Sequence, residues 1–95
     1  MIEFIKISKT AIRSALSLFV VNVREKKRWT QKELADQLYV SVRWLQSLEK
    51  GSKIPSLYLA VNLIVLLEID PAELFRAIVE KMREEAGEDV SLSRS

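Results

Sequence analysis

The chain has no cysteine and no histidine among its 95 residues. Disulfide bonds and thiolate metal sites are therefore excluded, together with zinc sites and general bases that depend on histidine. We expect no cofactor and no metal ion. An enzyme is the class of protein that the sequence favours least, because acids and nucleophiles do not recur in a cluster and a small helical chain offers little cleft.

Long apolar runs are also missing. The longest, from Leu57 to Leu67, is interrupted by Asn62 and falls short of the ~20 residues that a bilayer span requires. Residues 1–21 have the rough outline of a signal peptide, but Asn22 and Arg24 follow where a small-residue cleavage site is expected. The sequence therefore predicts a cytoplasmic protein that does not enter a membrane.

The remaining composition, 48% hydrophobic and 29% charged, fits one compact domain whose modest core favours dimerisation. Charge is divided along the chain. Residues 1–56 carry 11 Lys and Arg against 5 Asp and Glu, whereas residues 57–95 carry 4 against 8. A basic half is what phosphate binding requires, and a solvated face with a chance asymmetry is the alternative interpretation.

The stretch from Trp29 to Gly51 predicts two short amphipathic helices joined by a turn, which is the arrangement of a helix-turn-helix. Thr30 and Glu33 form a capping box that starts the first helix at about Gln31. Ser41 can cap the second helix. Apolar residues recur at helical spacing on the inner faces of the two helices: Leu34, Ala35, Leu38, Leu45 and Leu48.

Three further helices are predicted, which makes the chain all-α. The first runs from about Thr10 to about Lys27. The fourth begins after Ser56 and is apolar nearly all round, so its second face should be buried against something else. The fifth has Asp70 as its cap and Pro71 at its first position. The expected organisation is an N-terminal arm at 1–9, a domain at 10–86 whose last helix ends at Gly87, and a disordered tail at 87–95.

Residues across most of the chain, roughly 17 to 75, match one family in both order and spacing. They are Arg24, Thr30-Gln31, Glu33-Leu34-Ala35, Ser41, Leu45, Leu48-Glu49-Lys50-Gly51, Pro55-Ser56 and Asp70-Pro71-Ala72-Glu73-Leu74. The chain thereby resembles the Xre/Cro-CI family of bacterial and phage helix-turn-helix regulators. The resemblance implies a five-helix, lambda-repressor-like DNA-binding domain with the helix-turn-helix at helices two and three.

Two residues depart from the family pattern. Arg28 and Tyr39 stand where relatives usually carry glycine, at positions expected to need a left-handed conformation. We expect the turn to be reshaped around them. A reshaped turn would change how deeply Val42 and Arg43 enter a DNA groove.

The outward positions of the second motif helix are candidates for contact with bases. Arg43 comes first, since a guanidinium binds guanine O6 and N7 bidentately, with a phosphate contact as the alternative. Val42 can touch only apolar edges such as the thymine methyl group. Gln46 and Ser47 are the remaining candidates, although Gln46 could equally be solvated.

Other residues are candidates for contact with DNA phosphates. Family members clamp a phosphate with a glutamine at the position of Gln31, and the alternative here is an exposed glutamine without a partner. The remaining candidates are Trp44, Lys50, Ser52, Lys53 and Arg28. Trp44 could instead pack under the first helix, and Arg28 could simply be solvated, as could its neighbour Lys27.

The resemblance also implies contacts within the protein. Arg24 and Glu49 match the family's internal ion pair between the first helix and the end of the recognition helix. Separately, the surplus apolar surface of helices four and five predicts the interface of a homodimer. Its expected residues are Leu63, Leu66, Leu67, Phe75, Ile78, Val79 and Met82.

The leading hypothesis is a sequence-specific transcriptional regulator that binds double-stranded DNA as a homodimer. Two recognition helices ~34 Å apart would bind a roughly palindromic operator. Phage repressors and the controllers of restriction-modification systems both fit. A second hypothesis is a HipB-like antitoxin that binds a toxin and represses its own operon, favoured by Trp29-Thr30-Gln31 and the N-terminal extension. A third is a protein-interaction domain that has lost DNA binding.

Overall fold

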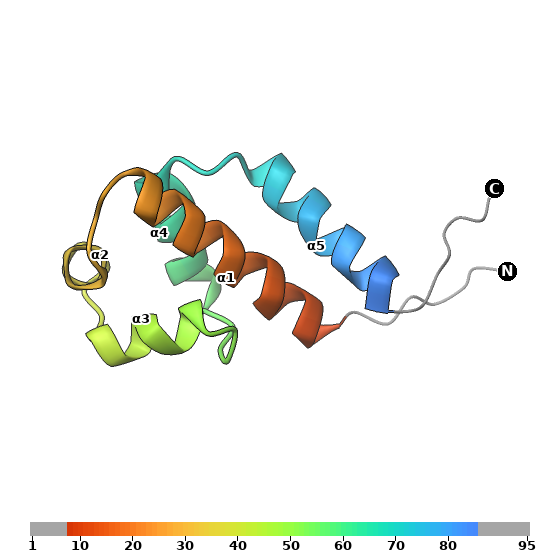
Figure 1. Ribbon diagram of the computed structural model, residues 1–95, viewed down its shortest axis with the longest axis horizontal. Coiled ribbons are helices and arrows are strands. Elements are labelled where there is room, and N and C mark those ends of the chain that lie inside the picture. The colour runs from red at the N-terminus through yellow and green to blue at the C-terminus, as the bar shows by residue number, and fades with distance from the viewer. Residues whose placement is uncertain (1–7, 86–95) are drawn as a thin grey trace, which may run out of the picture.

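The computed structural model describes residues 8–85, which form five helices and no strand (Figure 1). The helices are α1 (Lys9–Lys26), α2 (Gln31–Leu38), α3 (Val42–Glu49), α4 (Leu57–Leu67) and α5 (Pro71–Glu85). The predicted all-α class and the order of the helices are confirmed. The expected tail and residues 1–7 of the expected arm lie outside the described residues, as does Gly87.

Polar side chains set the starts of the helices. The Thr30 hydroxyl accepts from the Glu33 N–H at 3.0 Å, and Glu33 Oε1 accepts from the Thr30 N–H at 2.8 Å, so the predicted capping box is present. Serine hydroxyls accept from the N–H three residues on at the starts of α1, α3 and α4, and Asp70 accepts from Ala72 at the start of α5. These local bonds account for helix starts that the sequence predicted to within one residue.

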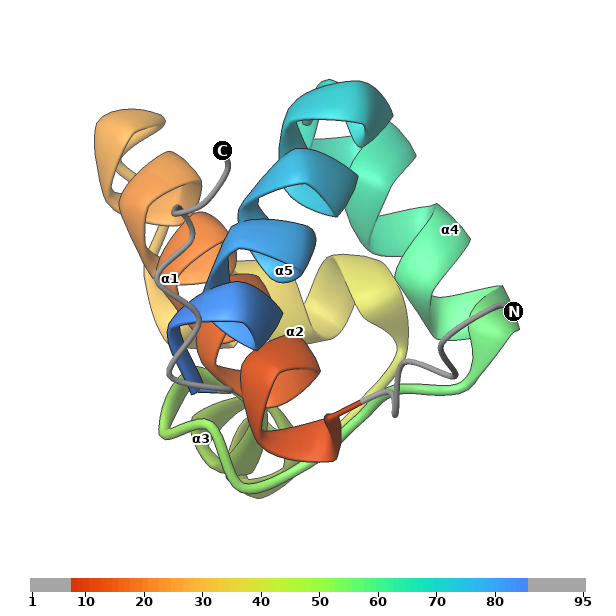
Figure 2. The same cartoon turned by 90° about the vertical axis from the view of Figure 1, so that its right-hand side faces the viewer.

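The core lies where the inner faces of the five helices meet. Its members are apolar and at most 6% exposed: Leu16, Val20, Leu34, Ala35, Leu38, Leu45, Leu48, Leu63, Leu67, Ile69 and Leu74. α1 and α5 lie side by side and antiparallel, with α3 below them in Figure 1, and α4 packs against α1 and α2 (Figures 1 and 2). None of the helices between residues 8 and 85 combines the length and apolar content needed to cross a bilayer.

Two left-handed residues close the turns of the motif. Arg28 has φ 62° and Tyr39 has φ 59°, as expected for positions where relatives carry glycine. The Tyr39 N–H donates to Asp36 O and the Val40 N–H donates to Ala35 O, the bonds of a Schellman motif. The expected reshaping of the turn is therefore wrong. Tyr39 is 94% exposed, so its side chain meets no obstacle, and only the local cost of its backbone conformation remains.

Replacing Tyr39 with glycine is expected to raise the free energy of unfolding by about 1 kcal/mol, because glycine adopts positive φ without the Cβ clash. Urea unfolding measures this change. Tyr39→Ala is the matched control, since it removes the same exposed ring but keeps the Cβ atom. Equal stability of the glycine and alanine variants would contradict the prediction.

Candidate DNA-binding surface

The recognition helix α3 lies along one edge of the molecule, the lower edge in Figure 1. Its two inward leucines are at most 1% exposed and fix the helix on the core. The four predicted base-contacting residues divide into two pairs. Arg43 and Gln46 are exposed, whereas Val42 and Ser47 are half-buried, and Val42 packs against the core. The two long polar side chains are therefore the ones free to meet a ligand.

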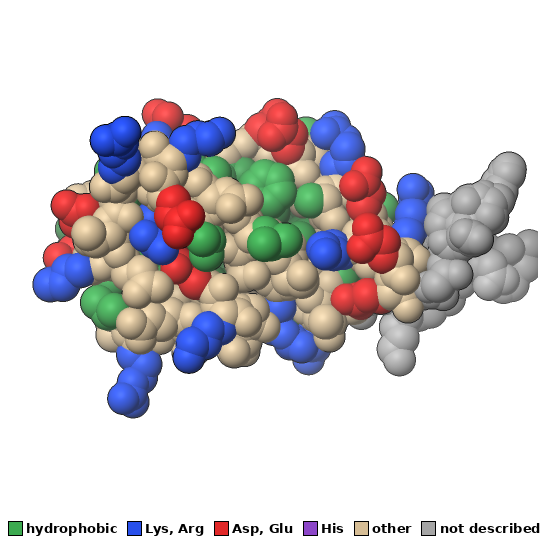
Figure 3. Space-filling view, viewed as in Figure 1, with side chains coloured by type: hydrophobic (Ala, Val, Ile, Leu, Met, Phe, Trp, Pro, Cys, Tyr) green, Lys and Arg blue, Asp and Glu red, His purple; other side chains and the backbone are tan. Residues whose placement is uncertain are grey.

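Basic side chains gather beside α3. Figure 3 shows them projecting along the lower edge of the molecule, while acidic side chains lie over the C-terminal half of α5. Lys50 is exposed at the end of α3, and the ammonium of Lys53 lies 5.7 Å from the centroid of the Trp44 ring. Trp44 is half-buried and packs against the core. Its ring therefore holds Lys53 near the recognition helix by a cation–π contact, which the sequence did not predict.

The loop after α3 turns back against α1. Gly51 has φ 77°, and the N–H groups of Gly51 and Ser52 donate to the carbonyls of Leu48 and Ser47. A Cβ atom at position 51 would lie 3.9 Å from the carbonyl oxygen of Arg13. The backbone of Arg13 in α1 therefore lies beside this loop, whereas its guanidinium donates to Thr10 Oγ1 at 3.4 Å.

Arg24 and Glu49 form the ion pair that the resemblance implies. Arg24 Nε donates to Glu49 Oε2 at 2.7 Å and its Nη2 donates to Oε1 at 3.0 Å. Nη1 donates to the Trp29 carbonyl at 2.8 Å, which ties the pair to the turn before α2. The side chains of Arg24 and Glu49 are only 11% and 7% exposed. The pair therefore joins α1 to the end of α3 by a bidentate contact.

The hydrogen bonds from Arg24 to Glu49 raise the pKa of Arg24 above its ordinary value; burial opposes this by desolvation, and the charges of Glu49 and Glu25 add to the rise. Because the pKa of Arg24 is higher in the folded protein than in the unfolded chain, the pair's contribution to stability is fully present below the unfolded-state pKa. It is lost only as the pH rises through the folded-state pKa. An increase to about pH 10 should therefore leave Arg24 charged.

Gln31 links this ion pair to the outer face of α3. Its Nε2 donates to Glu49 Oε1 at 2.9 Å, and its Oε1 accepts from Gln46 Nε2 at 3.3 Å. Gln31 therefore has partners, unlike the alternative of an exposed glutamine without one. One Nε2 hydrogen and the backbone N–H at the first position of α2 are left over after these bonds. No local sequence signal pairs Gln31 with Gln46, because tertiary packing alone brings the start of α2 against the second half of α3.

Two further basic residues lie in the turn after α1. Arg28 is exposed, and Lys27 Nζ lies 3.0 Å from Glu68 Oε1. Arg28 stands three residues before Gln31, and its contact with a phosphate stays a prediction.

The predicted dimer residues occupy very different environments. Leu63 and Leu67 are 0% and 1% exposed and belong to the monomer's own core, so neither can contact a second copy in this fold. Leu66, Ile78 and Met82 are half-buried, whereas Phe75 and Val79 are exposed. The outward face of α4 is formed instead by Leu57, Tyr58, Val61 and Val65, which are 49–81% exposed. The correction arises because α4 is apolar nearly all round, so the sequence could not identify its inner face.

One family model matches this chain. It is described as Helix-turn-helix and matches residues 22–74, more than half of the sequence. The match includes α2, α3 and α4, and it reaches from the ion-pairing end of α1 into the first turn of α5. No curated protein and no solved structure matches the chain.

Proposed function

Since the chain belongs to the Helix-turn-helix family of the Xre/Cro-CI type, whose domain binds DNA, we propose that it is a sequence-specific transcriptional regulator. It would bind a roughly palindromic operator as a homodimer. One observation carries the proposal: the outer face of α3 presents Arg43 and Gln46 to solvent, and no other part of residues 8–85 covers them.

Base recognition is assigned to these two side chains. Arg43 lies in the first turn of α3, the end that enters a major groove most deeply, and its guanidinium suits the O6 and N7 atoms of guanine. Gln46 lies almost one turn further on, and its hydrogen bond to Gln31 restricts the orientation of its amide. Val42 and Ser47, being half-buried, are left with smaller contacts.

Phosphate contacts are assigned to the residues around the two ends of the surface. At the end of α3 these residues are Lys50, Ser52 and Lys53, and the ammonium of Lys53 lies over the Trp44 ring. At the start of α2, the free backbone N–H and the remaining amide hydrogen of Gln31 can both bind a phosphate oxygen. Such contacts position the protein on the duplex without reading its sequence.

The ion pair supports this function by fixing the recognition helix. Arg24 contacts Glu49 at the end of α3, Glu49 contacts Gln31 at the start of α2, and Gln31 contacts Gln46. This chain of hydrogen bonds joins three helices and reaches the base-reading face. Binding then costs less ordering of side chains, because their positions are set before DNA arrives.

The variant Arg43→Ala tests the assignment of base recognition. An operator is first obtained by selecting bound sequences from a random duplex pool. Arg43→Ala is expected to weaken binding to that operator by roughly 5- to 150-fold, the equivalent of ~1–3 kcal/mol, and to weaken binding to random duplex much less. Titration of both duplexes by fluorescence anisotropy measures the two affinities.

Lys50→Ala is the matched control for that titration. It removes one charge from the other end of α3. We expect it to weaken binding to operator and to random duplex alike, and to lower the slope of log affinity against log salt concentration by about one. If Arg43→Ala also weakens both duplexes equally, Arg43 touches only phosphate. If no sequence is enriched from the pool, the proposed function itself fails.

A further inference from the structure

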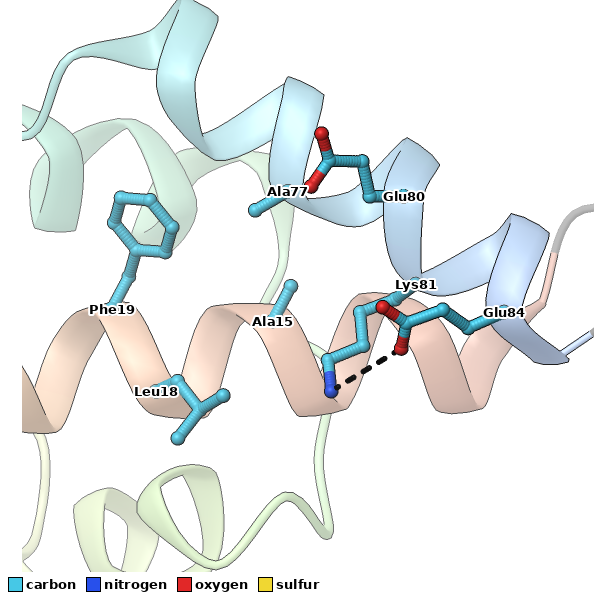
Figure 4. A pocket seen from close by; sticks show the side chains of 7 residues that line it. All are labelled: Ala15, Leu18, Phe19, Ala77, Glu80, Lys81 and Glu84. Carbon is cyan, nitrogen blue, oxygen red and sulfur yellow. Dashed lines mark ion pairs between the residues drawn. The ribbon is translucent and has the colours of Figure 1, made fainter. Parts of the chain in front are cut away.

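A shallow groove of about 130 Å³ runs between α1 and α5 (Figure 4). Its floor is apolar: Leu18 and Phe19 come from α1, and Ala77 comes from α5. Leu18 is 51% exposed, so a large part of its side chain meets water. Figure 3 shows apolar side chains gathered along this line between the two helices. All the residues that line the groove come from α1 and α5.

The rim of the groove is acidic. Glu80 and Glu84 lie on the α5 side, and Lys81 Nζ reaches Glu84 Oε1 at 3.9 Å, the dashed contact in Figure 4. Among residues 8–85, no Lys or Arg nitrogen lies within 4.0 Å of Glu80. An occupant of this groove should therefore be apolar and carry at least one positive charge near Glu80.

The segment that precedes α1 has this chemistry. Residues 1–7 read MIEFIKI, in which five side chains are apolar and the only charges are Glu3 and Lys6. The segment joins the fold at Ser8, whose hydroxyl contacts the Glu85 carboxylate at the end of α5. Glu85 directly follows the rim residue Glu84, so Ser8 lies beside the end of the rim that Glu84 forms.

Ser8, which follows this segment, does not continue the helix of α1. Ser8 has an extended conformation, with φ −96° and ψ 120°, and its hydroxyl caps the helix by accepting from the Ala11 N–H. Seven extended residues span up to ~23 Å. The groove occupies about two turns of α5, roughly 11 Å, so the segment is long enough to lie along it.

We propose that residues 1–7 of the same chain dock in the groove between α1 and α5. Alternation along an extended segment places Ile5 and Ile7 on the apolar floor, while Lys6 reaches the Glu80 carboxylate on the rim. The docked segment removes Leu18 and Phe19 from water and supplies the missing cation. This inference does not depend on DNA binding, because the groove is lined by α1 and α5 and not by α3.

Because the chain has no cysteine, a single introduced pair can test the proposal. The variant Lys6→Cys with Glu80→Cys replaces the proposed ion pair by two thiols. Lys6→Cys with Val79→Cys is the matched control, since residues 79 and 80 are neighbours on α5, are both exposed, and point to sides of the helix about 100° apart. Oxidation at low micromolar protein, followed by non-reducing electrophoresis and mass determination, gives the rate and the partner of each disulfide.

We expect the disulfide between positions 6 and 80 to form within one chain at least ten times faster than the disulfide between positions 6 and 79. Equal rates would mean that the segment has no preferred site, and a faster reaction at position 79 would place it on the flank of Phe75. Either result overturns the proposal. Disulfide-linked dimers as the main product would also overturn it, because the segment would then dock on a second copy.

Discussion

Replacing Arg24 with alanine is expected to lower the free energy of unfolding by about 3–5 kcal/mol. The loss is large because Glu49, 7% exposed, would keep a buried charge without its bidentate partner, and the Trp29 carbonyl would lose its donor. A domain of this size has only ~5–15 kcal/mol of stability, so the variant should unfold at much lower urea concentration. Urea unfolding followed by circular dichroism measures the change.

The double variant Arg24→Met with Glu49→Leu is the control that separates the pair from its burial. Replacing both charges with apolar side chains of similar volume leaves no unpaired group, so this variant should recover most of the lost stability. Its recognition helix would lack the contact to Gln31, and we expect weaker operator binding despite recovered stability. If the double variant is no more stable than Arg24→Ala alone, packing at this position matters more than charge.

Replacing Val65 with aspartate is expected to raise the dissociation constant of the proposed homodimer by at least a hundredfold, about 3 kcal/mol, if its interface is the outward face of α4. Val65, Val61 and Tyr58 form one stripe on the outward face of α4, beside the exposed Leu57. At about 150–200 Å² for each fully exposed large side chain, this patch offers roughly 450 Å² of apolar surface. That is more than half of the ~800 Å² that each partner buries in an interface of standard size.

Two aspartates would face each other in such an interface, one from each copy, and both would lose water without gaining a partner. Sedimentation velocity over a concentration series measures the dimer, and operator titration should show a parallel loss of affinity, since a monomer binds only one half-site. The wild-type protein must itself sediment as a dimer at micromolar concentration. A monomeric wild type would contradict both the interface and the homodimer.

Leu18→Asp is the matched control for this experiment. It makes the same change at another exposed apolar residue, 51% exposed, which lines the groove between α1 and α5 and does not belong to the outward face of α4. We expect Leu18→Asp to leave the dimer intact. Dissociation caused by Leu18→Asp, with none caused by Val65→Asp, would move the interface to the groove between α1 and α5.

The boundaries of the helices could be predicted because the signals for them are local. A serine or threonine hydroxyl needs only an N–H three residues away, and Pro71 needs only its own fixed φ. The left-handed conformation at Tyr39 followed from the family resemblance, because relatives carry glycine at that position. The expected reshaping of the turn was wrong. Because Tyr39 is exposed, its left-handed backbone conformation costs some stability but does not distort the turn.

The sequence also predicted which face of α3 is exposed, because the spacing of apolar residues along one helix is a local signal. Its apolar residues repeat at one helical spacing and leave Arg43 and Gln46 on the opposite side. In α4 the same reasoning failed, because nearly every position is apolar and no spacing distinguishes Leu63, which is buried, from Val65, which is exposed. Only the positions of the neighbouring helices decide which of these two faces the core.

By itself the sequence determined what each segment does alone: five capped helices, a motif with two leucines inward and an arginine outward, and a basic half joined to an acidic half. The tertiary structure alone decided the contacts between segments distant in the chain. These are the bond from Gln31 to Gln46, the approach of Arg13 to the loop of Gly51, and the outward face of α4. Helix formation depends on neighbours within four residues, whereas these contacts depend on how whole helices pack against one another.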